Sequence, residues 1–476
     1  MQTKALGRIM RSSQPAKASF WFTACNVVNK GLALLATPIL TRIMTTEQYG
    51  SFSVFQSWVS IFTIFCSLNL FQSAYSRGLV AYKGSEGAYC SSLLGLSTTL
   101  TLAVSLLVFM SLDFWTSVMA MSPLLVALMF IEIIFTTSYE FWAATQRFNY
   151  RYRALVTVSI AMNFLSLFVG VLAVLFSEYK VEARVIVDVL SKALPGAVLM
   201  IIIFARGKRF FTWEFWKYAL LFNIPLLPHF LSSYILNQSD RLMIASLSGK
   251  EMAALYSVAY SIAMVMTIVV NAINSSYVPY TYKEMSEHRI EGISHTSLPI
   301  LILVFALCVL VMAFAPEVLT VFAGPEYSEA VYIIPPLSAS VFYIFLYSLY
   351  SNIEYYYKET ATISLASVLC AALNIVLNLA AIPLFGYEAA AWTTLISYIA
   401  LSIFHGYFCH KICKREQIQD IYPDKSFALL SIAIMCVAFA MIPLSDAPAL
   451  RYAIISAIVV GVIINRGRIK AVLSRD

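Results

Sequence analysis

Charged residues are scarce in this chain of 476 residues. Asp, Glu, Lys and Arg make up only 12% of it, whereas 60% of its residues are hydrophobic. Soluble domains carry roughly 25% charged residues, and the mean hydropathy of this chain is +0.78. The composition therefore excludes an ordinary soluble protein.

Signals for processing and cross-linking are also missing. The N-terminus is basic, but no small-residue cleavage site follows a short apolar core, so we expect the first span to stay as an anchor. The eight cysteines lie mostly inside apolar runs. Only Cys409 and Cys413, with His405 and His410 nearby, have a spacing that suits a metal. Small buried hydrophobes are the better interpretation of these cysteines.

What the chain does have is a series of apolar runs of about 20 residues, the length that a helix needs to cross a hydrocarbon core. Backbone polar groups inside lipid must be satisfied within the segment, which makes these runs helices. We therefore predict an all-α polytopic membrane protein with about fourteen transmembrane helices joined by short connections. The spans fall at roughly 19–41, 51–73, 90–110, 123–142, 153–176, 184–205, 217–242, 252–275, 297–322, 330–351, 361–384, 387–409, 426–444 and 450–465.

Lys and Arg residues gather in alternate connections between these spans. About 24 of the 32 fall on one side and about six on the other, and an excess of positive charge marks the cytoplasmic side. We therefore expect both termini to be cytoplasmic. This bias, together with attraction to anionic membrane lipids, accounts for the net charge of +7 without a nucleic-acid partner.

Two distant stretches share one pattern, which indicates a duplicated half. The matching positions are Glu47, Gly50, Phe52, Ser53 and Ser57 in the first stretch and Glu251, Ala254, Tyr256, Ser257 and Ser261 in the second. We predict a six-helix half at 1–210, a parallel six-helix half at 211–415 and two additional helices at 416–476. Such repeats place a substrate between the halves at mid-membrane and support alternating access. The alternative is a bundle that merely holds a partner in the membrane.

Four basic residues lie within or close to the predicted spans, where ionisable groups are costly and usually functional. Lys30 falls near the middle of the first span, and the other three lie at or near span ends. Lys30 is the first choice, because no acidic residue lies at helical spacing from it. The others are Arg42, Arg77 and Arg241, although Arg42 and Arg241 can also reach the interface as long side chains. Lysine and arginine bind phosphate, so these cations favour an anionic substrate with a phosphate or diphosphate headgroup.

Three acidic residues are candidates for coupling transport to H⁺ or Na⁺: Glu132, Asp188 and Asp240. Each has a structural alternative. Asp188 can pair with Lys192 one helical turn later, in the favourable order, and Asp240 can pair with its neighbour Arg241. No cofactor and no resident metal are expected.

Pro225 and Pro228 interrupt the seventh span near its start, because proline removes a helical hydrogen bond. A broken helix exposes backbone groups that can contact a ligand or allow a bend during transport. A static kink is the alternative.

Three segments carry a family resemblance: residues 38–42 with 47–50, 240–241 with 256–260, and 374–391. The last is an Asn-rich helix that ends in Pro383 and Gly386 before small residues. Together they resemble polysaccharide-transporter flippases of the multidrug/oligosaccharidyl-lipid/polysaccharide exporter superfamily. One departure is Ala254, which stands where the family's second copy usually has glycine.

The resemblance implies a multi-pass flippase of the bacterial inner membrane, not an enzyme. It implies transport of a lipid-diphosphate-linked oligosaccharide, typically an O-antigen repeat unit on undecaprenyl diphosphate, to the periplasmic face. Arg42, Asp240 and Arg241 fall in the matched segments. A polymerase and chain-length proteins are the expected protein partners.

Two other functions stay open. A multidrug antiporter of the same superfamily would need an essential carboxylate in the first half. A membrane polysaccharide polymerase or glycosyltransferase would need a large extramembrane loop or a clustered acid/base set, and the sequence shows neither.

Overall fold

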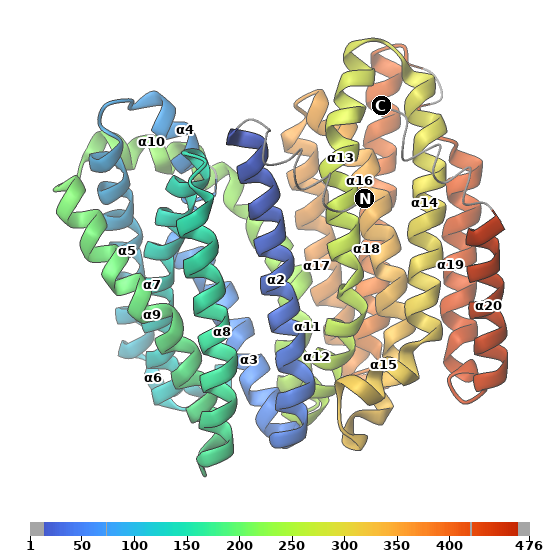
Figure 1. The fold of residues 1–476 in the computed structure, drawn as a ribbon, viewed down its shortest axis with the longest axis horizontal. Coiled ribbons are helices and arrows are strands. Elements are labelled where there is room, and N and C mark those ends of the chain that lie inside the picture. Colours follow the sequence, from blue (N-terminus) through green and yellow to red (C-terminus); the bar gives the residue numbers. More distant parts are fainter. Residues whose placement is uncertain (1–13, 73, 419–420, 465–476) are drawn as a thin grey trace. The chain divides into compact units, whose positions relative to one another are not determined.

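The computed structural model describes residues 14–72, 74–418 and 421–464, and every regular element among them is a helix. The predicted all-α membrane fold is therefore confirmed. The chain divides into two units, Met1–Tyr234 and Ile235–Asp476, with the boundary inside helix α11 (Figure 1). The division at 210 and 415 and the parallel repeat stay predictions, and both termini lie outside the described residues.

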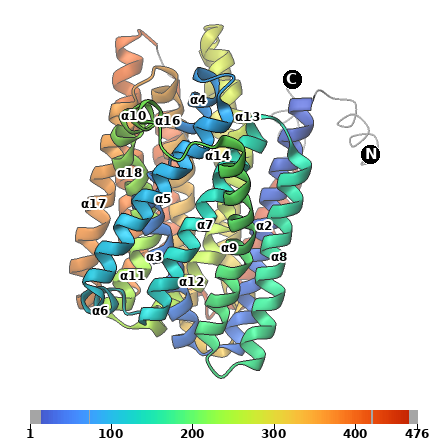
Figure 2. The ribbon, with the colours of Figure 1, turned by 90° about the vertical axis from the view of Figure 1, so that its left-hand side faces the viewer.

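Unit 1 holds the first group of helices, among which α8 and α9 are neighbours (Figure 2). Its elements are α2 (Gln14–Ile43), α3 (Thr46–Ser67), α4 (Ala74–Ala81), α5 (Glu86–Met110), α6 (Leu112–Met119), α7 (Pro123–Phe148), α8 (Tyr152–Phe176), α9 (Lys180–Gly207), α10 (Trp213–Asn223), the 3-10 helix η1 (Ile224–Leu226) and the start of α11 (Leu227–Leu247).

Unit 2 is built around α16, which is buried along most of its length. Its elements after α11 are α12 (Lys250–Met264), α13 (Met266–Ser286), α14 (Ile290–Ala313), α15 (Ala315–Phe322), the 3-10 helix η2 (Pro325–Ile333), α16 (Ile334–Tyr356), α17 (Thr360–Phe385), α18 (Ala389–Arg415), α19 (Asp424–Leu444) and α20 (Pro448–Ile464).

Within the described residues, 13 helical segments are long and apolar enough to cross a membrane. They correspond to the first thirteen predicted spans. The predicted span at 450–465 coincides with α20, which has 17 described residues. The predicted span at 297–322 was too long, because α14 ends at Ala313 and a separate helix restarts with Pro316 in its first turn, where proline is favoured.

Large apolar side chains such as Phe164 and Phe168 of α8 are exposed on the outside of unit 1, as expected for a surface that meets lipid. Inside the unit, α9 approaches α7 closely at Gly196. A Cβ atom there would lie 2.2 Å from the backbone oxygen of Phe135, so only glycine allows this contact. The contact brings the charged face of α9 against α7.

The predicted break at Pro225 and Pro228 is present as η1, a 3-10 turn between α10 and α11. Beside it, the buried Asn223 donates a hydrogen bond of 2.6 Å from Nδ2 to the backbone oxygen of Leu68. Leu68 ends α3 in the left-handed conformation. One side-chain hydrogen bond thus connects the end of α3 with the break at η1.

Candidate functional site

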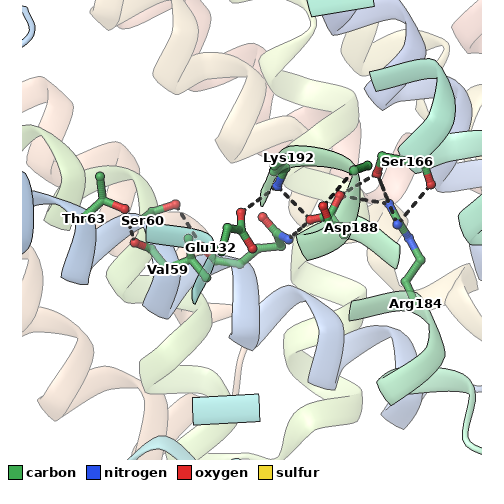
Figure 3. A network of polar contacts seen from close by, with 10 residues as sticks. Val59, Ser60, Thr63, Glu132, Ser166, Arg184, Asp188 and Lys192 are labelled. Atoms are coloured by element: carbon green, nitrogen blue, oxygen red, sulfur yellow. Dashed lines mark hydrogen bonds and ion pairs between the residues drawn. The ribbon is translucent and has the colours of Figure 1, made fainter. Parts of the chain in front are cut away.

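Four charged side chains meet inside unit 1 (Figure 3). The ammonium of Lys192 lies 2.7 Å from Glu132 Oε1 and 2.7 Å from Asp188 Oδ2. The guanidinium of Arg184 lies 3.7 Å from Asp188 Oδ1. Glu132, Arg184 and Asp188 are at most 5% exposed. We call these four residues the charged tetrad; with all four ionised, its two acids and two bases cancel.

The tetrad forms because α9 carries three of its members on one face. Arg184, Asp188 and Lys192 follow each other at intervals of four residues, which places them one above the other on a helix. Glu132 comes from the facing side of α7. The predicted pairing of Asp188 with Lys192 is therefore present, but Lys192 also forms an ion pair with Glu132.

Neutral polar groups complete the tetrad. Gln56 of α3 donates from Nε2 to Asp188 Oδ2 at 2.7 Å, and Ser166 of α8 donates to Asp188 Oδ1 at 2.5 Å. Arg184 donates to the backbone oxygen of Ser166 at 3.2 Å. Among the buried side-chain atoms of these residues, only Glu132 Oε2 has no hydrogen-bond partner in the described chain. Such a satisfied network holds charges that would otherwise be costly at membrane depth.

A cavity of about 260 Å³ adjoins the tetrad within unit 1. Its polar lining consists of Arg184, Asp188, Lys192, Gln56, Asn163 and Ser166. The aromatic side chains of Tyr49 and Phe52 and several residues of α2, among them Ala33 and Thr37, also line it. This site can contact a polar ligand from inside a membrane-length bundle; we call it the unit 1 pocket.

Unit 2 contains a second buried network, centred on the carboxylate of Asp240 in α11, which is 1% exposed. Tyr256 and Thr394 donate to Oδ2 at 2.5 and 2.6 Å, and Asn378 donates to Oδ1 at 2.7 Å. A further shell of hydrogen bonds links Ser239, Asn374 and Thr393 to these residues. In the described chain this carboxylate has no ion pair with a cation.

The family-like Asn-rich segment explains how the Asp240 network forms. Asn374 and Asn378 lie one turn apart on the buried face of α17, whereas Val376 and Leu379 on the other face are exposed. In a membrane helix this inverted pattern turns polar groups inward and apolar groups to lipid. The Asp240 network thus uses the inward face of α17, which composition alone would predict to be packed with apolar side chains.

The predicted cations lie at separate places. Lys30 is exposed on α2, and its spacing from Ala33 and Thr37 places it on the helix face that lines the unit 1 pocket. Arg77 does not end the second span; it is exposed on the separate helix α4, with its guanidinium 4.7 Å from the ring centre of Phe222.

Arg42 and Arg241 each contact their own helix. Arg42, in the last turn of α2, donates to the backbone oxygen of Pro38 at 2.6 Å. Arg241 lies inside α11, donates to Gln238 Oε1 at 2.6 Å and stacks on Tyr260 at 4.5 Å. The alternative pairing of Arg241 with Asp240 is not formed.

Arg184 and the partners of Asp240 were missed from the sequence. The interval of four residues from Arg184 to Asp188 and Lys192 was the available signal. A further buried pair, His405 Nδ1 with Glu354 Oε1 at 2.7 Å, was also missed. It comes from different helices, α18 and α16. Cys409 and Cys413 are free thiols, and the described residues contain no group of three or more His, Cys, Asp or Glu that could hold a metal.

The fold, a bundle of membrane-length helices with buried charges, is that of several solved membrane transporters. The structure is similar to lipid II flippase MurJ in an inward closed conformation, with a TM-score of 0.69, 16% identity, and coverage of 94% of this chain and 99% of that one. It is also similar to an inward-facing multidrug resistance MATE family transporter of the MOP superfamily. There the TM-score is 0.61 and the identity 13%, over 82% of this chain and 96% of that one.

The particular family follows from the sequence match. The family model described as polysaccharide biosynthesis protein matches residues 16–285, and the chain belongs to this family. Protein 1 of the Lsg locus of Haemophilus influenzae is 24% identical over 368 residues, which cover 74% of this chain and 88% of that protein. The predicted family resemblance is therefore confirmed.

Proposed function

We propose that this protein is a flippase, not an enzyme, and moves a lipid-diphosphate-linked oligosaccharide across the bacterial inner membrane by alternating access. The substrate would be an O-antigen or related repeat unit on undecaprenyl diphosphate, and both termini would be cytoplasmic. The observation that carries the proposal is the unit 1 pocket, a polar cavity enclosed by membrane-length helices of a polysaccharide-biosynthesis family member.

The physical problem of such transport is the polar head, because the lipid tail can remain in the bilayer. Burying a diphosphate is costly unless cations compensate its charge. Lys30, Arg77 and Arg241 form no ion pair with a carboxylate within the described residues. We therefore propose that these three residues, with Arg42 at the end of α2, are separate contacts that the diphosphate makes during its passage.

The tetrad has a different part in this proposal. It is already neutral, so an anion would have to compete with Glu132 and Asp188 for Lys192. Neutral sugar hydroxyls, in contrast, can bond to its exposed edges without leaving a charge unpaired. The unit 1 pocket therefore suits the oligosaccharide better than the diphosphate.

A coupling ion, H⁺ or Na⁺, would act at a buried carboxylate. Asp240 is the first choice, because its partners are neutral, and Glu132 and Asp188 are the second. Pro225 and Pro228 would provide the bend that accompanies transport. A polymerase and chain-length proteins would receive the product.

The experiment is deletion of the gene in its host, followed by electrophoresis of surface polysaccharide and isolation of lipid-linked intermediates. Loss of polymer with repeat units stranded on the cytoplasmic face would support the flippase. Intact polymer with raised drug sensitivity would favour the antiporter, and unpolymerised single units at the surface would favour the polymerase.

The cation assignment is tested by complementing the deletion with Lys30→Ala and Arg241→Ala variants. Lys208→Ala is the matched control, because Lys208 is an exposed cation that caps α9 away from the pocket. Loss of surface polymer with the first two but not with the control is expected. Unchanged polymer in all three would show that the assignment is wrong.

A further inference from the structure

A basic groove lies at one end of unit 1, where α2 begins and α7 turns into α8. Its volume is about 750 Å³. Its lining residues are Gln14, Lys17, Gln146, Tyr150, Arg151, Tyr152, Arg153 and Ala154. A second cavity of about 340 Å³ shares Gln146 and Arg151 with it and adds Asn149 and Arg206. Both cavities thus lie against the turn between α7 and α8.

The cations of this groove lack acidic partners. Lys17, Arg151, Arg153 and Arg206 form no ion pair in the part of the chain that the structure describes. Arg147, one turn before Arg151, differs, because its guanidinium lies 3.8 Å from Glu140. The acid that lines the second cavity, Glu86, pairs with none of the four. The groove therefore holds an uncompensated positive charge.

The groove is also built to hold its shape. The backbone nitrogen of Arg151 donates to the oxygen of Gln146 at 2.8 Å, and Tyr150 between them has a positive φ of 56°. Next to Arg151, Tyr152 of α8 stacks on Trp21 of α2 with ring centres 6.1 Å apart. These contacts fix Arg151 at the junction of the two cavities.

One buried polar side chain points to a ligand independently of the cations. Gln146 is 8% exposed and lines both cavities. Its side-chain amide forms no hydrogen bond with another described residue, although buried amides normally have partners. A ligand oxygen in the groove would satisfy its two donors.

We propose that this groove binds the phosphate headgroup of an anionic lipid. Arginine forks and a lysine ammonium match phosphate oxygens, and the Gln146 amide supplies a neutral donor between them. The groove lies at the boundary of α7 and α8, both of membrane length, on the side predicted to be cytoplasmic. Basic pockets between helices on that side bind lipid phosphates. The proposal does not depend on the transported substrate.

The test uses the full chain, purified and placed in phosphatidylcholine nanodiscs with or without cardiolipin. Bound lipid is measured by native mass spectrometry, and the melting temperature is measured in parallel. Removing two cations with Arg151→Gln and Arg153→Gln should weaken cardiolipin retention roughly tenfold or more. The matched control, Lys208→Gln with Arg209→Gln, removes the same charge from the same unit and should leave retention unchanged.

Competitors identify the source of the phosphate. Farnesyl diphosphate that displaces cardiolipin would assign the groove to the diphosphate of a polyprenyl lipid, whereas failure to displace it would assign the groove to membrane phospholipid. Either result supports a lipid-phosphate site. Equal retention in both double variants, or displacement by inorganic pyrophosphate as readily as by farnesyl diphosphate, would overturn it. Melting without cardiolipin shows whether each variant folds, and a Gln146→Leu variant repeats the test without changing charge.

Discussion

In unit 1 the buried carboxylates of Glu132 and Asp188 share the ammonium of Lys192, whereas in unit 2 the carboxylate of Asp240 meets only neutral donors. Both networks lie within membrane-length helices. In the tetrad, two cationic side chains balance the charge of the two carboxylates. The Asp240 network changes its net charge whenever the carboxylate binds or releases a cation.

The difference separates two tasks. A group that is neutralised by a fixed cation cannot take up a proton without leaving that cation unpaired, which is costly in a buried site. Asp240 carries no such penalty, since tyrosine and threonine hydroxyls both donate and accept. On this basis we propose that the tetrad has a structural and ligand-contacting role and that Asp240 couples transport to an ion.

The largest effect is expected from Lys192→Met in the tetrad. It leaves two buried carboxylates with one cation, and breaking a buried pair costs about 3–5 kcal/mol. Unfolding in detergent, followed by the melting temperature, measures the loss. The double variant Lys192→Met with Glu132→Gln restores the balance and should recover most of the stability. If it melts as early as the single variant, charge balance is not what holds the tetrad together.

Asp240→Asn should have a smaller effect on stability, about 1 kcal/mol, because the hydroxyls of Tyr256 and Thr394 can reverse their hydrogen bonds. Transport is expected to be lost or to become independent of the ion gradient, since the amide cannot bind a proton or balance a cation. Surface polysaccharide at varied external pH and Na⁺ provides the measurement. An Asp240→Asn variant with normal surface polysaccharide and normal ion dependence would contradict the proposal that Asp240 couples transport to an ion.

A double variant, Pro225→Ala with Pro228→Ala, tests whether the helix break at η1 acts during transport. Alanine restores helical hydrogen bonding at η1, so stability should be equal or higher. Polymer export, measured as a rate after induction, should slow severalfold if the bend moves. An unchanged rate would favour the static kink.

The smallest effect is expected at the ion pair of Arg451 and Glu317 in unit 2, because its carboxylate is partly exposed. Arg451 of α20 donates from Nη1 to both carboxylate oxygens of Glu317 at 2.8 and 2.7 Å. Partial burial alone would raise the pKa of Glu317, but hydrogen bonds from Arg451 and Tyr452 outweigh it and lower the pKa. Because the folded-state pKa is lowered, the stabilisation is complete above the unfolded-state pKa and disappears as the pH falls through the folded value.

The corresponding measurement is the melting temperature of the wild type and of Glu317→Gln as a function of pH. Near neutral pH the free energy of unfolding of the wild type should be higher by less than about 1 kcal/mol, since water screens the partly exposed carboxylate. The wild type should therefore melt at a slightly higher temperature. The difference should shrink and vanish as the pH falls through the lowered folded-state pKa of Glu317. A difference that grows as the pH falls would contradict the assigned direction.

Much of the fold followed from hydrophobic length, because a membrane span needs about 20 apolar residues and little else. The break at Pro225 and Pro228 followed from proline chemistry. The end of α14 was missed, since the apolar run continues through Pro316 into a separate helix. Run length cannot distinguish one long span from a span followed by a short amphipathic helix.

The site was predicted only in part. Glu132, Asp188 and Asp240 were chosen because charge at membrane depth is costly, and all three are buried in polar networks. Several of their partners come from other helices, so Gln56, Asn378 and Thr394 left no local signal. The exposed cations Lys30 and Arg77 could be found by position, but what they bind stays a prediction.

The central claim is that this chain moves a lipid-diphosphate-linked oligosaccharide, and reconstituted translocation tests it most directly. Purified protein would be placed in vesicles loaded with lipid-linked repeat units extracted from the deletion strain, and a membrane-impermeant glycan reagent would follow their sidedness. We expect the inner pool to become accessible with wild-type protein, more slowly with Asp240→Asn, and not in empty vesicles. Accessibility equal to that of empty vesicles, with folded wild-type protein present, would contradict the account.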